Sequence, residues 1–252
     1  MKLGMCTDLM NAELVAAAGF DYIESSLTAI ATADEGAMNK MGKALSLSGI
    51  GVEAMNIMIP GSYRLTGPEV DLTAAREYVD CALGRAAAFN VQVQVFGSGA
   101  ARNVPDDWPR ARALEQIAEY LDMAATIAAG WGIAIAIEPL NTGECNVINT
   151  VTEALALSAR VNRPNVGVLA DWFHMSRMNE GVEGILAAGD RLLHCHVANP
   201  EGRRFPLDGD GGDLSPFFNA LKAIDYRGRV SVEGTGAAAE YGSALSCLRR
   251  YL

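Results

Sequence analysis

The chain alternates between short apolar runs and longer stretches with helical spacing, and it does so eight times within 252 residues. The short runs are rich in β-branched residues, which favours strands, and they cover residues 2–6, 22–25, 52–57, 91–96, 133–137, 166–170, 192–198 and 229–232. A helical pattern follows each run, over residues 12–18, 34–48, 72–89, 111–129, 151–161, 181–188, 214–223 and 239–251. Such alternation implies a parallel sheet with right-handed crossovers. Eight units in a chain of this length predict an α/β protein, a (β/α)8 TIM barrel with one domain over residues 1–252.

A doubly wound open sheet is the alternative architecture for the same alternation. A dinucleotide-binding fold of that kind needs a GxGxxG turn after its first strand, and this chain has none there. The barrel is therefore the favoured fold. In a barrel, function lies at the carboxyl ends of the strands.

Composition excludes several classes of partner. The formal net charge is −10, the sequence pI is about 4.8 and no basic run is present, which argues against a nucleic-acid or anionic-membrane partner. The first ten residues, MKLGMCTDLM, lack a signal-peptide pattern, and no apolar stretch is long enough to span a bilayer. Five scattered cysteines without paired spacing indicate reduced thiols, so we expect a cytoplasmic protein in which Cys145 and Cys195 are small buried residues.

Two long connections follow the third and fourth predicted strands, over residues 58–71 and 97–110. Connections of this length are typical of lids or substrate loops. The glycines at 97 and 99, with Arg64 and Arg102 nearby, could contact an anionic group, and a plain mobile turn is an equally open interpretation.

Acidic and imidazole side chains stand at or near the ends of the last four predicted strands. They are Glu138, Asp171, His196 and Glu233. Because the carboxyl ends of parallel strands meet at one mouth of a barrel, we expect these side chains to converge. Oxygen and nitrogen ligands in one cluster predict a site for a divalent metal ion.

The neighbours of these residues refine the prediction. All three histidines lie within 23 residues, and His194 and His196 are two apart, so both point to the same side of the sheet. His196 is nearer the carboxyl end and is the better ligand, whereas His194 is expected to pack beside the site. Asp171 could instead cap a helix, although His174 adds a second polar group three residues later. A buried Glu138 would be costly unless it is paired or bound to a metal.

Four segments carry a resemblance to a known family: EPLNTGECNVINT from Glu138, ADWFHM from Ala170, LLHCHVANPEGRRFPLDGDG from Leu192 and VSVEG from Val230. They resemble the sugar isomerase/epimerase superfamily with a xylose-isomerase-like barrel, which includes ketose 3-epimerases and hydroxypyruvate isomerase. Two departures lie in one loop. Asn199 stands where family members often carry Asp, and PLDGDG stands where they often carry Pro-Gly-x-Gly.

The resemblance implies roles for seven residues. Glu138, Asp171, His196 and Glu233 would bind Mn²⁺, with Mg²⁺ or Co²⁺ as alternatives, and Glu144, His174 and Arg203 would bind the hydroxyl and carbonyl oxygens of the substrate. Glu138 and Glu233 would also act as the two acid/base catalysts of a 3-epimerisation that passes through an enediolate. The partner would be a small-molecule sugar, and the resemblance allows a homodimer or homotetramer.

The sequence thus predicts a divalent-metal-dependent ketose 3-epimerase or a close aldose-ketose isomerase. A hydroxypyruvate isomerase, and a lyase or dehydratase acting on a keto-sugar or keto-inositol, remain open because they need the same proton transfer. A barrel that only binds a sugar or another subunit also remains open. An endonuclease for abasic DNA is disfavoured, because it needs a multi-zinc cluster with more than three histidines and a less acidic surface.

Overall fold

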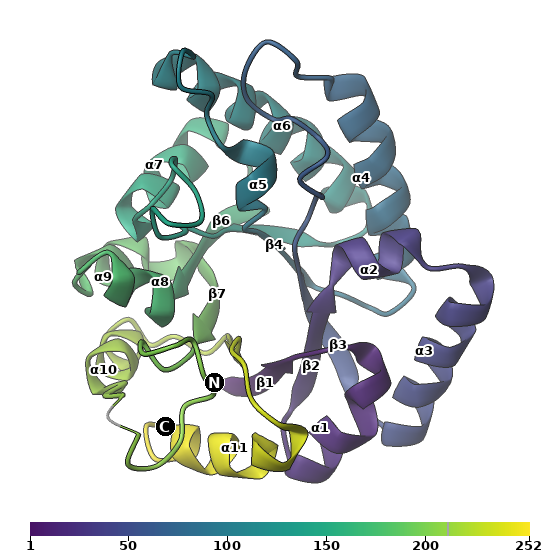
Figure 1. Ribbon diagram of the computed structural model, residues 1–252, viewed down its shortest axis with the longest axis vertical. Helices are drawn as coiled ribbons and strands as arrows, with labels where there is room; N and C mark the ends of the chain where they lie inside the picture. Colours follow the sequence, from purple (N-terminus) through teal and green to yellow (C-terminus); the bar gives the residue numbers. More distant parts are fainter. Residues whose placement is uncertain (211) are drawn as a thin grey trace.

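A computed structural model describes residues 1–210 and 212–252. Eight parallel strands close into a barrel in chain order, and the helices lie outside the ring of strands (Figure 1). The strands are β1 (Lys2–Cys6), β2 (Tyr22–Ser26), β3 (Gly51–Asn56), β4 (Val93–Phe96), β5 (Ala134–Ile137), β6 (Val166–Asp171), β7 (Leu192–Val197) and β8 (Arg229–Val232). The predicted (β/α)8 barrel is confirmed, with each strand within two residues of its expected position.

The helices follow the strands in the predicted order. They are α1 (Ala12–Ala18), α2 (Leu27–Thr32), α3 (Glu35–Ser48), α4 (Leu72–Ala87), α5 (Gly99–Arg102), α6 (Arg110–Gly130), α7 (Val151–Val161), α8 (Trp172–Arg177), α9 (Glu183–Ala188), α10 (Ser215–Ala223) and α11 (Tyr241–Arg249). The sequence did not predict α2, α5 and α8, because each has only four to six residues and begins within three residues of the end of a strand. Among the described residues, no helix combines the length and apolar character needed to cross a membrane.

Side-chain caps explain where several helices begin. The side chains of Asp34, Asp71 and Thr150 each accept a hydrogen bond from a backbone N–H in the first turn of α3, α4 and α7, at 2.7, 2.9 and 3.1 Å. Gly19 and Gly49 end α1 and α3 in the left-handed conformation, with φ of 92° and 69°. These caps mark where the helices begin and end.

Successive inward-facing residues, two apart on each strand, form layers across the barrel. A small apolar cluster fills part of the interior: Tyr22, Ala54, Val95, Ala136 and Leu169 belong to one layer, and Val93 lies one layer deeper. The row nearest the mouth lies two residues further along each strand than the layer of Tyr22. It is mostly polar and comprises Cys6, Glu24, Asn56, Gly97, Glu138, Asp171, His196 and Glu233. All four residues that the sequence singled out as metal ligands therefore lie in one layer at the carboxyl ends of the strands.

The absence of a side chain at Gly4 makes room for Tyr22 inside the barrel. A Cβ atom at Gly4 would lie 2.2 Å from Cζ of the Tyr22 ring, and the two residues are paired between β1 and β2. The Tyr22 hydroxyl reaches across the barrel to Ser231 Oγ at 2.7 Å. Tyr22 thus fills the centre directly beneath the polar row.

Replacing Gly4 by Ala should destabilise the protein by about 1–3 kcal/mol, because the new methyl group overlaps a fully buried ring. The matched control is Gly51→Ala, also in a strand, where an added Cβ meets nothing within 4 Å and should change stability by less than about 0.5 kcal/mol. Urea denaturation of the two variants measures the difference. Equal stability of both would show that the interior is not close-packed around Tyr22.

Candidate metal and substrate site

Four residues predicted to bind a metal come together at the mouth of the barrel. One ligand atom from each of Glu138, Asp171, His196 and Glu233 lies within 4.8 Å of the others. Glu138 directly follows β5, Asp171 ends β6, His196 lies in β7 and Glu233 directly follows β8. The convergence is an observation of the structure, and the role of these residues as ligands stays a prediction.

The two ring nitrogens of His196 face in opposite directions. Nδ1 lies 3.1 Å from Glu138 Oε1, 3.5 Å from Glu233 Oε2 and 4.0 Å from Asp171 Oδ2. Nε2 lies 3.0 Å from Glu24 Oε1, on the side of the ring away from these three carboxylates. An ion held by the four residues would therefore be bound through Nδ1.

Asp171 caps α8 with one carboxylate oxygen and directs the other toward the cluster. Its Oδ1 accepts hydrogen bonds from the backbone N–H groups of Phe173 and His174, at 2.7 and 3.3 Å, and so caps α8. Its Oδ2 is buried and has no hydrogen-bond partner among the described residues. A buried carboxylate oxygen without a partner is costly, and a cation beside it would remove that cost.

The charge balance of the cluster also suits a cation. Burial lowers the pKa of His196, but the carboxylates of Glu24 and Glu233 outweigh it and raise that pKa well above its ordinary value. The surrounding carboxylates thus favour positive charge at this point. Three carboxylates and one imidazole are a donor set that fits Mn²⁺, Mg²⁺, Co²⁺ or Zn²⁺.

Glu138 and Glu233 have unlike surroundings. Glu233 accepts a hydrogen bond from Asn56 Nδ2 on one oxygen, at 3.0 Å, and pairs with the Arg203 guanidinium on the other. Burial raises the pKa of Glu233, but His196 and Arg203 outweigh it and lower that pKa to about 2. Burial is also the largest influence on Glu138, where only His196 offers a side-chain hydrogen bond, and the pKa of Glu138 is raised. The two carboxyl groups are therefore shifted in opposite directions.

Glu138 needs a glycine beside it. A Cβ atom at Gly97 would lie 2.2 Å from Glu138 Oε2. Gly97 follows β4 in the same row of inward-facing positions, so its missing side chain gives the Glu138 carboxylate its space.

The predicted contact of Arg102 with an anionic ligand is wrong. The Arg102 side chain is fully buried, and its guanidinium donates to the backbone carbonyls of Phe96 and Glu138 at 2.9 and 2.6 Å. It therefore ties the end of β4 to the end of β5. Arg64 is exposed, and its guanidinium donates to the carbonyl of Ala100 at 3.4 Å.

The two long connections are tied to each other. The backbone N–H of Leu65 donates to the carbonyl of Ala101 at 2.9 Å, and that of Ile59 donates to Ser98 Oγ at 3.1 Å. Met58, Ile59 and Leu65 are buried. These contacts hold the connections as an ordered wall of the mouth, in place of the mobile turn that the sequence left open.

His174, predicted to bind the substrate, is fixed in one tautomer. Its Nδ1 faces the backbone N–H of Asn141 at 3.2 Å, so Nδ1 accepts and the proton of a neutral ring is on Nε2. Nε2 is buried, has no hydrogen-bond partner among the described residues, and lies 3.7 Å from Asp171 Oδ2. The ring thus presents an N–H donor toward the cluster. No sequence pattern singled out Asn141.

Arg203 and Glu144, also predicted to bind the substrate, face each other across the mouth at 3.4 Å. The Arg203 guanidinium lies over the Phe173 ring, with Cζ 5.0 Å from the ring centroid. Gly202 and Arg203 both have left-handed backbones, with φ of 77° and 51°. This strained turn, held by a hydrogen bond from Thr235 N to the Arg203 carbonyl at 2.8 Å, aims the arginine at the site.

Asn199 shapes the same loop. Its Oδ1 accepts from the backbone N–H of Glu201 at 2.8 Å, and its backbone N–H donates to the Arg204 carbonyl at 2.8 Å. The residue that departs from the family pattern therefore acts within the loop that carries Arg203. Gly211, in the segment that reads PLDGDG, lies outside the described residues.

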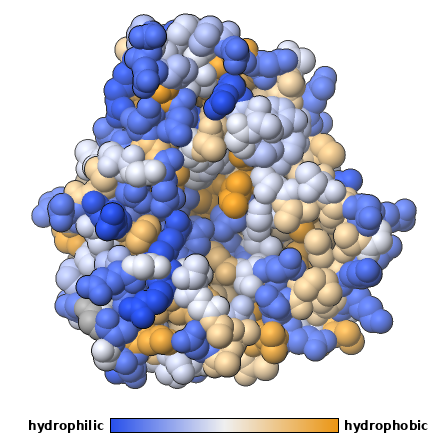
Figure 2. Space-filling view, viewed as in Figure 1, coloured by the Kyte–Doolittle hydropathy of each residue, from blue (hydrophilic) through white to orange (hydrophobic). Residues whose placement is uncertain are grey.

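The predicted catalytic and substrate-binding residues, apart from the buried His174, line one pocket of about 380 Å³ at the mouth. Its lining comprises Asn56, Ile57, Gly97, Ser98, Glu138, Leu140, Glu144, Arg203, Glu233, Gly234 and Thr235. The face shown in Figure 2 is hollowed near its centre, where hydrophilic and apolar side chains lie side by side.

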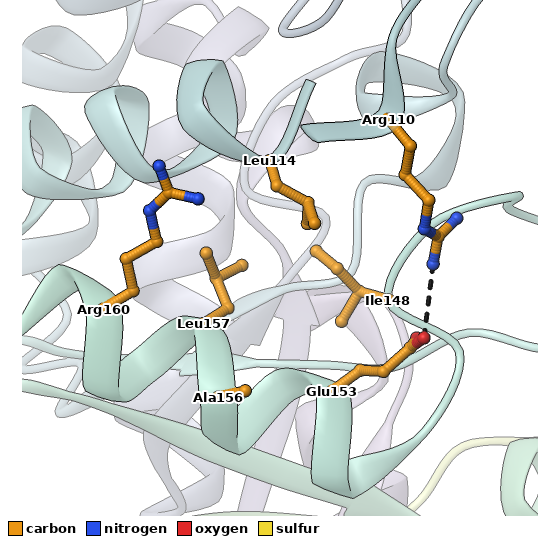
Figure 3. A pocket seen from close by; sticks show the side chains of 7 residues that line it. All are labelled: Arg110, Leu114, Ile148, Glu153, Ala156, Leu157 and Arg160. Carbon is orange, nitrogen blue, oxygen red and sulfur yellow. Dashed lines mark hydrogen bonds and ion pairs between the residues drawn. The ribbon is translucent and has the colours of Figure 1, made fainter. Parts of the chain in front are cut away.

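A second hollow, of about 240 Å³, lies between α6 and α7 on the outer wall and shares no lining residue with the first (Figure 3). Its floor is apolar, and its two arginines are each close to a glutamate, Arg110 to Glu153 at 3.2 Å and Arg160 to Glu115 at 3.6 Å. It carries none of the predicted site residues.

Sequence reasoning missed Glu24 on β2. This carboxylate is fully buried, and its oxygens contact His194 Nε2 at 2.7 Å and His196 Nε2 at 3.0 Å. Burial raises the pKa of Glu24, but the two histidines outweigh it and hold that pKa well below its usual range. The signal was present, because Glu24 follows Tyr22 and Ile23 near the end of an apolar run in the same way as the four residues that were found.

Comparison with known proteins identifies the family. The sequence model of the family described as xylose isomerase-like TIM barrel matches residues 12–251 of this chain. The chain belongs to this family. An L-ribulose 3-epimerase of Methylomonas sp. (strain DH-1) is 40% identical over 122 residues, which are 48% of this chain and 40% of that protein. The match therefore spans less than half the length of that relative.

Solved structures of the family share the fold. A D-psicose 3-epimerase from Clostridium cellulolyticum H10, determined with D-tagatose, superposes with a TM-score of 0.88 at 22% identity, covering 100% of this chain and 99% of that one. The IolI protein, determined with a bound zinc atom, gives a TM-score of 0.74 at 20% identity, with 100% and 99% coverage. At these sequence identities the structural similarity shows that the fold is shared, and it does not extend to the chemistry of the site.

Replacing Gly97 by Ala should weaken Mn²⁺ binding by at least about tenfold, because the new methyl group would displace the Glu138 carboxylate. The matched control is Gly42→Ala in α3, where an added Cβ meets nothing within 4 Å and Mn²⁺ affinity should be unchanged. Isothermal titration with MnCl₂ measures both. Wild-type affinity in the Gly97 variant would exclude Glu138 as a ligand in the observed geometry.

Proposed function

We propose that this protein is a divalent-metal-dependent epimerase that inverts the third carbon of a ketose. Glu138, Asp171, His196 and Glu233 would hold the ion, and Glu138 and Glu233 would also move the proton. Mn²⁺ is the proposed ion, with Mg²⁺ and Co²⁺ as alternatives. The similarity to an L-ribulose 3-epimerase supports the reaction class.

The observation that carries the proposal is that two glutamates at the mouth of the barrel have pKa values shifted in opposite directions. Glu138 and Glu233 extend from β5 and β8, three places apart in the ring of eight strands, so their carboxylates reach the pocket from different sides. Epimerisation needs one group that removes a proton from one face of a carbon and another that returns a proton to the opposite face. Surroundings that raise the pKa of Glu138 and lower that of Glu233 suit an acid and a base, respectively.

The proposed reaction begins with Glu233 as a carboxylate and Glu138 as a carboxylic acid. Glu233 takes the proton from the third carbon, the electron pair of that C–H bond forms a double bond to the carbonyl carbon, and the π pair of the carbonyl moves onto its oxygen. A bound divalent ion would supply electrostatic stabilisation of the charge on that oxygen. Glu138 then gives its proton to the opposite face of the carbon, and exchange with solvent restores both glutamates. The reverse epimer uses the same pair with the roles exchanged.

The remaining pocket residues would hold the substrate. The N–H at His174 Nε2 would donate to a substrate oxygen, since it is a buried donor that has no partner among the described residues. Arg203 would donate to the carbonyl oxygen, and Glu144 would accept a hydrogen bond from a hydroxyl group. These roles rest on the geometry of the pocket and on the family resemblance.

The charges of the pocket favour a neutral substrate. Three of its lining residues are acidic, Glu138, Glu144 and Glu233, and the one lining cation among the described residues, Arg203, is paired with two of them. Hydroxypyruvate and sugar phosphates carry negative charge and would lack a free cation to meet it. An unphosphorylated ketose meets the same groups through its hydroxyls.

The two-base scheme predicts a different defect for each glutamate. Glu138→Gln and Glu233→Gln should both lose epimerisation by about 10²–10⁴-fold. Each variant should still exchange the third-carbon proton of the one epimer whose C–H bond faces the remaining glutamate. NMR of each separate epimer in deuterated water with MnCl₂ reports exchange and product together.

Glu53→Gln is the matched control, because Glu53 is a half-buried carboxylate in an ion pair but lies away from the mouth. Its partners are Lys2, at the start of β1, and Arg229, at the start of β8. It should epimerise and exchange like the wild type. Wild-type protein should act on an unphosphorylated ketose in preference to hydroxypyruvate. Exchange of both epimers by either mouth variant would contradict the two-base scheme, and turnover of hydroxypyruvate alone would contradict the substrate class.

A further inference from the structure

We propose that Glu24 is a positioning residue for the metal site, which holds the His196 ring so that the lone pair of Nδ1 faces the mouth. The inference rests on the proposed function, because it assumes that the four mouth residues bind a divalent ion. Glu24 itself would not touch the ion or the substrate. It would act through the far nitrogen of His196.

Glu24 is placed for this role on the opposite side of the His196 ring from the other three carboxylates. Its side chain is fully buried, and Oε1 lies 3.0 Å from Nε2 of His196, the nitrogen that faces away from Glu138, Asp171 and Glu233. A metal-binding histidine in proteins usually donates its second N–H to a carboxylate, a carbonyl or water, and that bond fixes both the tautomer and the ring orientation. Glu24 supplies such a carboxylate from the opposite side of the barrel, since β2 and β7 are three places apart in the ring.

The other contacts of Glu24 leave it only one role toward His196, that of acceptor. Its Oε2 accepts from Ser231 Oγ at 2.6 Å and lies 2.7 Å from His194 Nε2. The Tyr22 hydroxyl lies 2.7 Å from Ser231 Oγ and can donate to it while Ser231 donates to Glu24. An ionised Glu24 has no proton to give, so both histidines donate through Nε2. In the neutral ring that a metal ion requires, the proton then stays on Nε2 and the lone pair of Nδ1 faces the mouth.

A second arrangement of the same residues is possible in principle. Cys6, Glu24 and His196 also bring one ligand atom each within 4.8 Å of one another. An ion there would need Nε2 of His196 as a ligand and would displace Glu24 from the histidines that it now contacts. Because both oxygens of Glu24 are already engaged, we favour the positioning role, and the alternative becomes an outcome of the test.

The variant that tests the proposal is Glu24→Gln, which keeps the size of the side chain and replaces one acceptor by an amide donor. Its dissociation constant for Mn²⁺, measured by isothermal titration, should rise by about 10–100-fold. Tyr22→Phe is the matched control, because it removes a buried hydrogen bond in the next layer and leaves the contact between Glu24 and His196 in place. Its Mn²⁺ affinity should stay within about threefold of the wild type, although its stability falls.

Wild-type Mn²⁺ affinity in Glu24→Gln would overturn the proposal, and so would an equal loss in both variants, which would indicate general packing. Failure of the wild type to bind Mn²⁺ would overturn it together with the proposed metal dependence. If Mn²⁺ binding depends on Glu24 but the wild type has no epimerase activity, the positioning role is supported and only the proposed reaction is contradicted.

A second measurement needs no variant. The protein has only three histidines, so long-range ¹H–¹⁵N NMR of the Mg²⁺-loaded wild type can assign the protonated nitrogen of each ring. The expected result for His196 is a proton on Nε2 and none on Nδ1. A proton on Nδ1, or loss of the Nε2 proton when Mg²⁺ binds, would overturn the proposal, and the second result would indicate an ion between Cys6, Glu24 and His196.

Discussion

The contacts of His196 are the interaction on which the rest of the site depends. Its ring lies between Glu24 on one side and the carboxylates of Glu138, Asp171 and Glu233 on the other, with Glu24 and Glu138 at 3.0 and 3.1 Å from its two nitrogens. Four acidic groups around one ring would repel one another without positive charge among them. The excess of negative charge favours a cation at the mouth, and the two ring nitrogens of His196 separate the three carboxylates on one side from Glu24 on the other.

The two-residue period of the strands creates this division. His194 and His196 lie on neighbouring layers, as do Tyr22 and Glu24. The deeper layer packs around Tyr22, and the upper layer carries the charge. Two glycines make the layers compatible, since Gly4 leaves room for the Tyr22 ring and Gly97 leaves room for the Glu138 carboxylate. The same strands therefore carry both the packed layer around Tyr22 and the charged layer at the mouth without steric overlap between them.

Much of the fold and part of the site could be predicted from the sequence, for physical reasons. Apolar runs separated by helical spacing identify strands, and the carboxyl ends of parallel strands meet at one mouth, so the sequence alone was enough to group Glu138, Asp171, His196 and Glu233. Glu24 obeys the same rule and was overlooked. The burial of Arg102 could not be foreseen, because α5 has only four residues and its contacts are to backbone carbonyls of other segments. The tautomer of His174 and the left-handed turn at Arg203 likewise depend on contacts far apart in the chain.

The central claim is that one divalent ion binds between four residues at the mouth, through Nδ1 of His196. Crystals soaked in MnCl₂ and measured near the manganese absorption edge test it most directly, because anomalous scattering locates the ion without assumptions about activity. The account predicts one peak at about 2.1 Å from Glu138, Asp171, Glu233 and Nδ1 of His196. A peak beside Nε2 of His196, or no peak at the mouth, would contradict it.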